Sequence, residues 1–296
     1  MKIDVVRALR KAAPYLRMFQ GHTFVVKFGG EATRNIEDAR GLLEQVGILQ
    51  QLGIRVVVVH GGGPQATDLA KRLDAHSEFV DGRRVTNSGM LEALILALHG
   101  EVRTLLLSAA RELGVPAIGL SGVDAGLITA RKRPTDKVDY GYVGDIVGVD
   151  GSVISDLIEC GYLPIVSPLC ADPSGQVLNV NADIVASAIA VELGAAKLVL
   201  VTGAPGILRD VADPGSLISE LDLEELRKLN ASGCLKDGML PKSSAIESAL
   251  VGGVKRIHIV SYEYPDSLLT EVFTNEGCGT LIVASMKDLE AEETAL

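Results

Sequence analysis

The stretch Phe24-Val25-Val26-Lys27-Phe28-Gly29-Gly30 decides the fold. Its apolar run predicts a short buried strand, which carries Lys27 to its end and then breaks into two glycines before a helix. A cation beside backbone that has no Cβ is the arrangement that a phosphate group needs. On its own, the same pattern is equally typical of an edge strand whose lysine reaches water.

A second unit of strand, glycine turn and helix follows the first. Residues 55–60 read Arg-Val-Val-Val-Val-His, a run typical of a parallel strand buried on both faces, and Gly61-Gly62-Gly63-Pro64 comes next. Two such units place both glycine turns at one edge of a sheet, where open α/β folds bind ligands. Strands and helices alternate along the rest of the chain, which predicts a three-layer αβα sandwich around a mainly parallel sheet.

Length and composition limit the possible functions. A chain of 296 residues with 47% hydrophobic residues can form one large α/β domain or two lobes sharing a core. A net charge of −10 argues against a nucleic-acid or anionic-membrane partner. The longest apolar stretches, such as 195–208, are broken well short of a membrane span, and we find no signal peptide. We therefore expect a cytoplasmic protein.

The cysteines support the same localisation. They follow no spacing typical of a metal site or a disulfide framework, and we expect reduced thiols: Cys160, Cys170, Cys234 and Cys278.

Residues 2–19 have apolar positions at a helical period and a basic outer face. Pro14 is expected to end or kink this helix. Two interpretations remain open for residues 1–20: a helix packed on its own domain, or an arm that contacts other subunits.

Several polar residues follow predicted strand ends or begin predicted helices. Arg84 lies in a predicted hairpin around Asp81-Gly82, and residues 127–148 are expected to form an antiparallel flap. Asp183 comes two residues after Asn181, a predicted N-cap, so helix capping alone could explain this carboxylate. Lys242 is expected in a loop.

Six motifs occur in order along the chain: VVKFGG, VVVHGGGPQ, FVDGRRVT, LNVNAD, GMLPK and NEGCGT. Together they resemble the amino-acid kinase family, and within it the acetylglutamate kinases, over about residues 23–283. The resemblance implies transfer of the ATP γ-phosphoryl group to the side-chain carboxylate of N-acetyl-L-glutamate, in arginine biosynthesis. It also implies Mg²⁺ held by phosphate oxygens and water, with no metal ligand from the protein.

The resemblance also implies roles for individual residues. Lys27 and Lys242 would flank the transferring phosphoryl group, and Asp183 would hold both ammonium groups, which suits a reaction that needs positioning and charge neutralisation. An N-terminal lobe (21–193) would bind the acyl amino acid, and a C-terminal lobe (194–296) the nucleotide. The remaining implied contacts are Gly29, Gly30 and Gly62 to phosphate, Gly62, Gly63, Arg84 and Asn179 to substrate, and Thr202, Gly203, Gly206 and Lys242 to nucleotide.

Three positions depart from the family pattern. Gly203 and Asp237 stand where the family usually has Asp and Gly, which bears on ATP binding. Asp266 replaces the His usual in arginine-inhibited members. The resemblance to those members implies a homo-oligomer, a dimer or a hexamer, and an arginine effector site at Tyr15, Glu271, Gly277 and Gly279.

Two alternatives remain. Residues 14–25 and 29–32 also look like the kinase-like domain of N-acetylglutamate synthases, so the chain could be a non-catalytic arginine-sensing module that works with an acetyltransferase. Otherwise it could be a kinase for N-acetyl-aminoadipate, since one methylene changes affinity in a pocket by only ~1–3 kcal/mol.

Overall fold

The computed structural model describes residues 2–75, 78–80, 83–136, 138–210, 212–233, 235, 239–274 and 277–287. The helices are α1 (Lys2–Phe19), α2 (Ile36–Gln51), α3 (Gly63–Arg72), α4 (Ser88–Ile95), α5 (Arg103–Glu112), α6 (Ser152–Glu159), α7 (Ala182–Glu192), α8 (Leu223–Ala231), α9 (Met239–Val251) and α10 (Ser267–Phe273). Short helical turns are η1 (Glu31–Thr33), η3 (Asp124–Gly126) and η4 (Pro214–Ser216), and η2 (Leu96–Val102) is a π-helix.

The strands are β1 (Thr23–Phe28), β2 (Arg55–His60), β3 (Glu78–Val80), β4 (Arg83–Val85), β5 (Ala117–Ser121), β6 (Ile128–Lys132), β7 (Gly144–Val149), β8 (Leu163–Ser167), β9 (Leu169–Ala171), β10 (Val177–Asn179), β11 (Lys197–Thr202), β12 (Ile207–Leu208), β13 (Leu217–Ile218), β14 (Glu220–Asp222), β15 (Arg256–Ser261) and β16 (Thr280–Val283).

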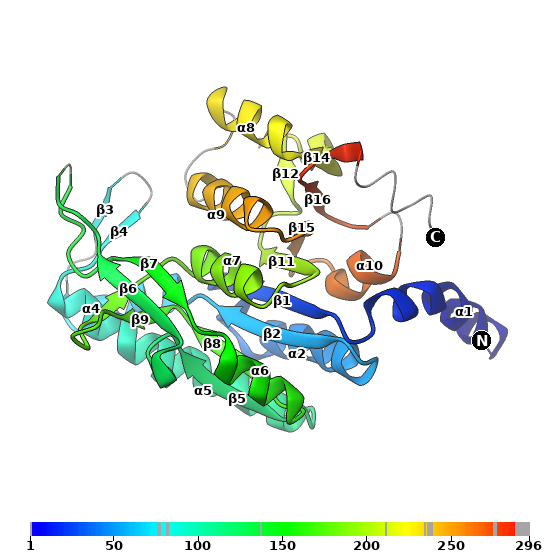
Figure 1. Cartoon of the computed structure of the whole chain (residues 1–296), viewed down its shortest axis with the longest axis horizontal. Helices are drawn as coiled ribbons and strands as arrows, with labels where there is room; N and C mark the ends of the chain where they lie inside the picture. The colour runs from blue at the N-terminus through cyan, green and yellow to red at the C-terminus, as the bar shows by residue number, and fades with distance from the viewer. Residues whose placement is uncertain are drawn as a thin grey trace.

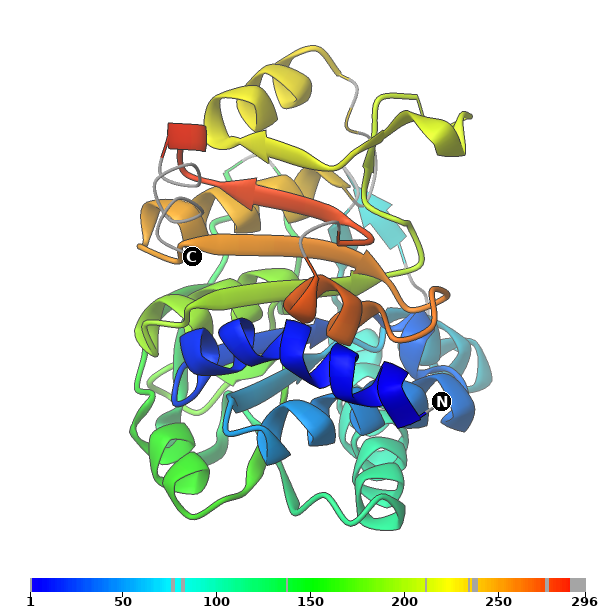
Figure 2. The ribbon, with the colours of Figure 1, turned by 90° about the vertical axis from the view of Figure 1, so that its right-hand side faces the viewer.

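In the described part of the chain, the main sheet has eight strands in the order β14-β16-β15-β11-β1-β2-β8-β5 (Figure 1, Figure 2). All neighbouring strands are parallel except β15 and β16. After its first residue, each of β1 and β2 is fully buried, as their unbroken apolar runs predict. The prediction of a mainly parallel α/β sheet is confirmed.

Alternating residues of β1 face two different cores, which makes the fold three-layered. Val25 packs with α7 and α9 on one face, whereas Val26 and Phe28 pack with α2 and α5 on the other. The sheet is continuous between β1 and β11, so the boundary predicted at residues 193/194 falls within one sheet. The division into two lobes stays a prediction.

A smaller sheet, β10-β9-β6-β7, and the hairpin β3-β4 lie at the same end of the molecule as α4 (Figure 1). The antiparallel pairing of β6 with β7 confirms the expected flap. The hairpin also forms where predicted, although its turn, Asp81-Gly82, lies outside the described residues.

The helix from Ser88 to Glu112 is long and apolar enough to cross a membrane by length and composition alone. The expectation that no apolar stretch reaches that length is therefore wrong. The reason for its apolar character is structural, because Leu94 and Leu98 lie in one core cluster and Leu106 lies in another. Within this run the π-helix η2 lies between α4 and α5, which the residue pattern did not indicate.

Helix α1 runs to Phe19 with Pro14 inside it, so this proline does not end the helix. Its C-terminal part packs on the domain: Phe19 is 6% exposed and meets the ring of Phe24 edge-on at 5.2 Å between centroids. The helix contacts α10 (Figure 2), and its N-terminal part extends away from the rest of the molecule (Figure 1). Both packing and an arm role are compatible with this placement.

Candidate active site

A cavity of about 310 Å³ opens at the carboxyl ends of β1 and β2, beneath the β3-β4 hairpin. The structure brings most of the residues expected at the site to this one cavity, and those that line it are Lys27, Gly30, Gly62, Gly63, Arg84, Asn179 and Asp183. Gly29, Thr202, Gly203 and Gly206 do not line it. Lys242 meets the others through Asp183, while its neighbour Pro241 lines the wall.

Asp183 bridges the two lysines at the floor of the cavity. Lys27 Nζ lies 2.8 Å from Asp183 Oδ1, and Lys242 Nζ donates to Asp183 Oδ2 at 3.0 Å. The three side chains come from β1, α7 and α9, and α7 packs directly on α9. The prediction that Lys242 lies in a loop is wrong, because α9 already begins at Met239. Asn181 caps α7 by accepting from the N–H of Asp183 at 2.8 Å, so capping belongs to Asn181 and leaves both carboxylate oxygens of Asp183 for the lysines.

The cluster carries one excess positive charge in an almost dry place, since its residues are only 6–8% exposed. Burial opposes ionisation of Asp183, but the two lysines outweigh burial and hold the pKa of this carboxyl well below its usual range. Burial lowers the pKa of Lys242; Asp183 opposes that shift and the charge of Lys27 adds to it. Such a cluster favours the approach of an anionic group.

The two glycine turns present backbone N–H groups beside these lysines. Among the described residues, the N–H groups of Gly30, Gly62 and Gly63 have no acceptor. The N–H of Gly29 differs, because it donates to the carbonyl oxygen of Val201 at 3.0 Å within the sheet. This amide cannot therefore face a phosphate group, and any role of Gly29 in phosphate binding would come from its lack of a side chain.

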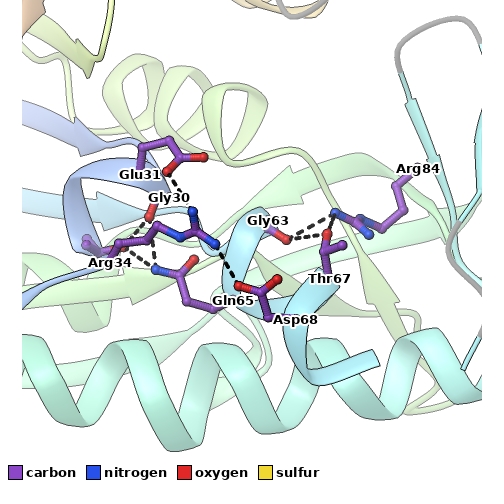
Figure 3. A network of polar contacts seen from close by, with 9 residues as sticks. Gly30, Glu31, Arg34, Gly63, Gln65, Thr67, Asp68 and Arg84 are labelled. Atoms are coloured by element: carbon purple, nitrogen blue, oxygen red, sulfur yellow. Dashed lines mark hydrogen bonds and ion pairs between the residues drawn. The ribbon is translucent and has the colours of Figure 1, made fainter. Parts of the chain in front are cut away.

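Arg84 reaches back to the second glycine turn. Its Nη2 donates to the carbonyl oxygen of Gly63 at 3.1 Å and to Thr67 Oγ1 at 2.8 Å (Figure 3). The guanidinium also lies over the ring of Phe79, 4.6 Å from its centroid. Burial lowers the pKa of Arg84, but a guanidinium stays charged at neutral pH. A half-buried cation in the cavity wall suits a carboxylate ligand.

Asn179 also lines the cavity and is oriented by a buried threonine. Its Nδ2 donates to Thr86 Oγ1 at 3.1 Å, and Thr86 is fully buried. The amide oxygen of Asn179 makes no protein hydrogen bond among the described residues.

The residues expected to bind nucleotide follow β11 beside the first glycine turn. A Cβ on Gly203 would meet Tyr262 at ordinary contact distance, so packing does not exclude the aspartate usual in the family. Packing explains why position 206 is a glycine, because a Cβ there would collide with Thr280. Asp237 lies outside the described residues.

The described residues contain no cluster of histidine, cysteine or carboxylate side chains that could hold a metal ion. Asp183 is the one described carboxylate that lines the cavity, and both its oxygens face lysines. The donor set of the described residues therefore does not fit a divalent cation.

A second buried charged chain lies where β11, β15 and α10 meet, near the expected effector residues. Lys197 Nζ lies 3.3 Å from His258 Nε2, and His258 Nδ1 lies 2.7 Å from Glu271 Oε1. Burial, aided by the charge of Lys197, lowers the pKa of His258 to about 4, so the ring is neutral at pH 7 and donates to Glu271. Glu271 also accepts from the N–H of Cys278 at 2.8 Å.

The expected effector residues differ in what surrounds them. Gly277 has a φ of +59°, and a Cβ there would lie 2.9 Å from Glu271 Oε2, whereas a Cβ on Gly279 would collide with the carbonyl of Ile259. Tyr15 lies on α1, the helix that contacts α10, and packs at the edge of the hydrophobic core that includes Phe19 and Phe24. Asp266 takes a left-handed conformation at the start of α10 and makes no capping bond.

Sequence reasoning missed three polar residues, of which Lys197 and His258 are buried and Gln65 is partly buried. Lys197 and His258 lie within apolar strands, and no neighbouring residue indicated that they would meet. Gln65 joins the two glycine turns. The sequence feature that could have identified it is its position in the motif VVVHGGGPQ.

The chain is similar to known proteins over most of its length. The profile of the family described as "Amino acid kinase family" matches residues 22–261. The chain belongs to the amino acid kinase family. Acetylglutamate kinase of Myxococcus xanthus (strain DK1622) is 46% identical over 291 residues, covering 95% of this chain and 94% of that protein.

Solved structures include more distant relatives within the amino acid kinase family fold. N-acetylglutamate synthase from Neisseria gonorrhoeae, complexed with coenzyme A and N-acetyl-glutamate, superposes with a TM-score of 0.84 at 30% identity. The match covers 95% of this chain but 63% of that synthase chain, so the synthase is the longer protein. The same synthase complexed with coenzyme A and L-arginine gives a TM-score of 0.83 at 29% identity, over 95% of this chain and 65% of that one.

Proposed function

We propose that the chain transfers the γ-phosphoryl group of ATP to the side-chain carboxylate of N-acetyl-L-glutamate, in arginine biosynthesis and in the cytoplasm. The observation that carries this proposal is the bridge from Lys27 through Asp183 to Lys242 at the floor of a cavity lined by free glycine N–H groups. Its excess positive charge matches a reaction whose transition state spreads negative charge over phosphoryl oxygens.

In this reaction a substrate carboxylate oxygen attacks the γ-phosphorus, and the bond from that phosphorus to the β–γ bridging oxygen breaks. ADP leaves with the bonding electrons, and an acyl phosphate is formed. No proton has to be removed from an ionised carboxylate, so Asp183 needs only to hold Lys27 and Lys242 in place. The two lysines would neutralise charge on the transferring group.

The glycine turns would bind the reacting groups, and side chains of the cavity walls would bind the rest of the acyl amino acid. The N–H of Gly30 would face phosphate oxygens, and those of Gly62 and Gly63 would face the reacting end of the acyl amino acid. Arg84 and Asn179 would bind its α-carboxylate. Thr202 and the residues after it would contact the nucleotide. Mg²⁺ would accompany ATP on the phosphate oxygens, because the described residues offer it no ligand set.

Trapping of the acyl phosphate as a hydroxamate tests the proposed function. With ATP, Mg²⁺ and N-acetyl-L-glutamate, the purified chain is expected to form hydroxamate at a rate proportional to enzyme. No product from the wild type would contradict kinase activity and support an arginine-sensing module. Greater kcat/KM for N-acetyl-aminoadipate in the same assay would instead identify the longer substrate; one methylene is worth roughly 10- to 200-fold.

We also propose a homo-oligomer, a dimer or a hexamer, whose N-terminal helices join subunits and couple arginine binding to the active site. Three observations support this proposal. Helix α1 extends from the body, it packs against α10, and α10 carries the buried Glu271. None of the expected effector residues lines the cavity, so arginine would act through the fold and not by competition in the site.

Deletion of residues 1–20 is expected to lower the mass measured by light scattering and to abolish inhibition by L-arginine. The reason is that α1 supplies Tyr15 to the proposed effector region and the proposed contact between subunits. The kcat without arginine is expected to stay within about threefold, because α1 does not touch the cavity. An unchanged mass would contradict the arm, and a wild-type curve flat to millimolar arginine would contradict the effector role.

A further inference from the structure

Gln65 joins the two glycine turns by direct hydrogen bonds. From the first turn of α3, its Nε2 donates to the carbonyl oxygen of Gly30 at 2.9 Å (Figure 3). The same Nε2 donates to Thr33 Oγ1 at 3.2 Å. Thr33 in turn donates its hydroxyl to the same carbonyl at 3.1 Å, and it is only 1% exposed. The Gly30 carbonyl is therefore fixed by two side chains, one from each unit.

The two turns also touch without any room between them. A Cβ on Gly30 would lie 2.6 Å from Pro64 Cδ and 3.0 Å from the nitrogen of Gly63. A Cβ on Gly62 would lie 2.7 Å from Leu98 Cδ2, so the π-helix supports this turn from the side opposite Gly30. Packing sets how closely the turns approach, whereas hydrogen bonds with fixed direction are needed to set how they slide past each other.

We propose that Gln65 is a positioning residue that fixes the spacing between the phosphoryl group at Gly30 and the acceptor carboxylate at Gly62 and Gly63. This inference rests on the proposed function, which places the two reacting groups on the two different turns. Lys27 precedes Gly30 on β1, so displacement of the first turn would also move the catalytic ammonium. Misplacement of about 1 Å can cost about 10²-fold in rate.

The other atom of the Gln65 amide argues that this residue serves geometry more than stability. Its Oε1 is buried and has no hydrogen-bond partner among the described residues. Burying an acceptor without a donor is unfavourable, so a methionine of similar length would relieve that cost. Gly30 O would keep its bond from Thr33. Loss of Gln65 should therefore affect catalysis without a matching loss of stability.

A matched contact joins the same two segments at the surface. Arg34 Nη2 lies 2.7 Å from Asp68 Oδ2, and the two side chains are about half exposed, at 49% and 54% (Figure 3). An exposed ion pair contributes little to the position of buried backbone. It connects η1 and α3 as Gln65 does, without touching Gly30, and is therefore the control.

Gln65→Met is expected to lower kcat by roughly 10- to 100-fold and to change the KM for N-acetyl-L-glutamate less than threefold. The Tm is expected to stay the same or rise. Thr33→Val should cost less, and the double variant should lose less than the product of the two single effects, because both side chains act on one carbonyl. Asp68→Asn should match the wild type in all three quantities.

Normal kcat in Gln65→Met would overturn the inference, as would a fall in kcat that Asp68→Asn reproduces. A readout independent of turnover separates this result from failure of the proposed function. Amide hydrogen exchange of the apo protein over residues 29–35 is expected to accelerate at least threefold in Gln65→Met and to stay unchanged in Asp68→Asn. If the wild type forms no acyl phosphate, the proposed function fails, and unaltered exchange would still overturn the role of Gln65.

Discussion

Lys27→Met is expected to lower kcat by about 10²- to 10³-fold, the scale of losing one charge-stabilising donor in a dry site. The unfolding free energy should change by less than about 1 kcal/mol, because the variant replaces a cluster of two cations and one anion by the neutral pair Lys242–Asp183. The substitution removes the Coulomb repulsion between Lys27 and Lys242 together with the attraction between Lys27 and Asp183. Hydroxamate formation measures kcat, and urea unfolding measures stability.

Lys197→Met is the matched control for this variant. Lys197 is also a buried lysine in a central strand, 3% exposed, but it lies at the first residue of β11, opposite Phe24, and meets His258. This variant is expected to keep kcat within about threefold. Near-normal turnover in Lys27→Met, or an equal loss of turnover in Lys197→Met, would contradict the mechanism.

Asp183→Asn is expected to reduce both activity and stability. It leaves two buried ammonium groups facing each other without a counter-charge, which costs about 3–5 kcal/mol for a broken buried pair. The kcat should fall at least 10²-fold, since both lysines lose the group that aligns them. The expected pattern thus differs from that of Lys27→Met, in which activity falls and stability stays.

The control for Asp183→Asn addresses helix capping. Glu224→Gln removes an exposed first-turn carboxylate from α8 and its ion pair with Lys228, where the helix dipole is worth about 0.3–1 kcal/mol and the i,i+4 pair about 0.2–0.5 kcal/mol. A loss in Asp183→Asn no larger than this would contradict the bridge.

Acid gives a second check on Asp183, because its pKa is lower in the folded protein than in the unfolded chain. The stability from this carboxylate is fully present above the unfolded pKa of about 3.9 and is lost as the pH falls through the folded value. The difference in unfolding free energy between wild type and Asp183→Asn should therefore shrink below about pH 4.

The elements that local pattern determines could be predicted from sequence. The valine runs of β1 and β2 read as strands buried on both faces, and the glycines after them marked the ligand edge. The lysine at the end of β1 was identified from its place in this pattern. Resemblance to a family added Lys242, because nothing near this residue indicates that α9 packs on α7 and carries the lysine to Asp183.

What could not be predicted depends on contacts between distant residues. The meeting of Lys197, His258 and Glu271 needs three elements to be placed first, and each residue alone looks like an ordinary polar position. The N–H of Gly29 was expected to face a phosphate, but the pairing of β1 with β11 uses it. The apolar character of 88–112 reads as a possible membrane span until its neighbours in the core are known.

The π-helix η2 has a consequence for insertions and deletions. A π-turn contains one residue more than an α-helical turn, so the helical phase changes by about 100° between α4 and α5. Leu98 and Val102, both against Gly62, lie within this change of phase. Deleting one residue from 96–102 would make the helix regular and keep Leu106 in phase with the core, but it would remove the wide turn that carries Leu98 and Val102 to Gly62. The length of this segment is therefore fixed by the glycine turn that it supports.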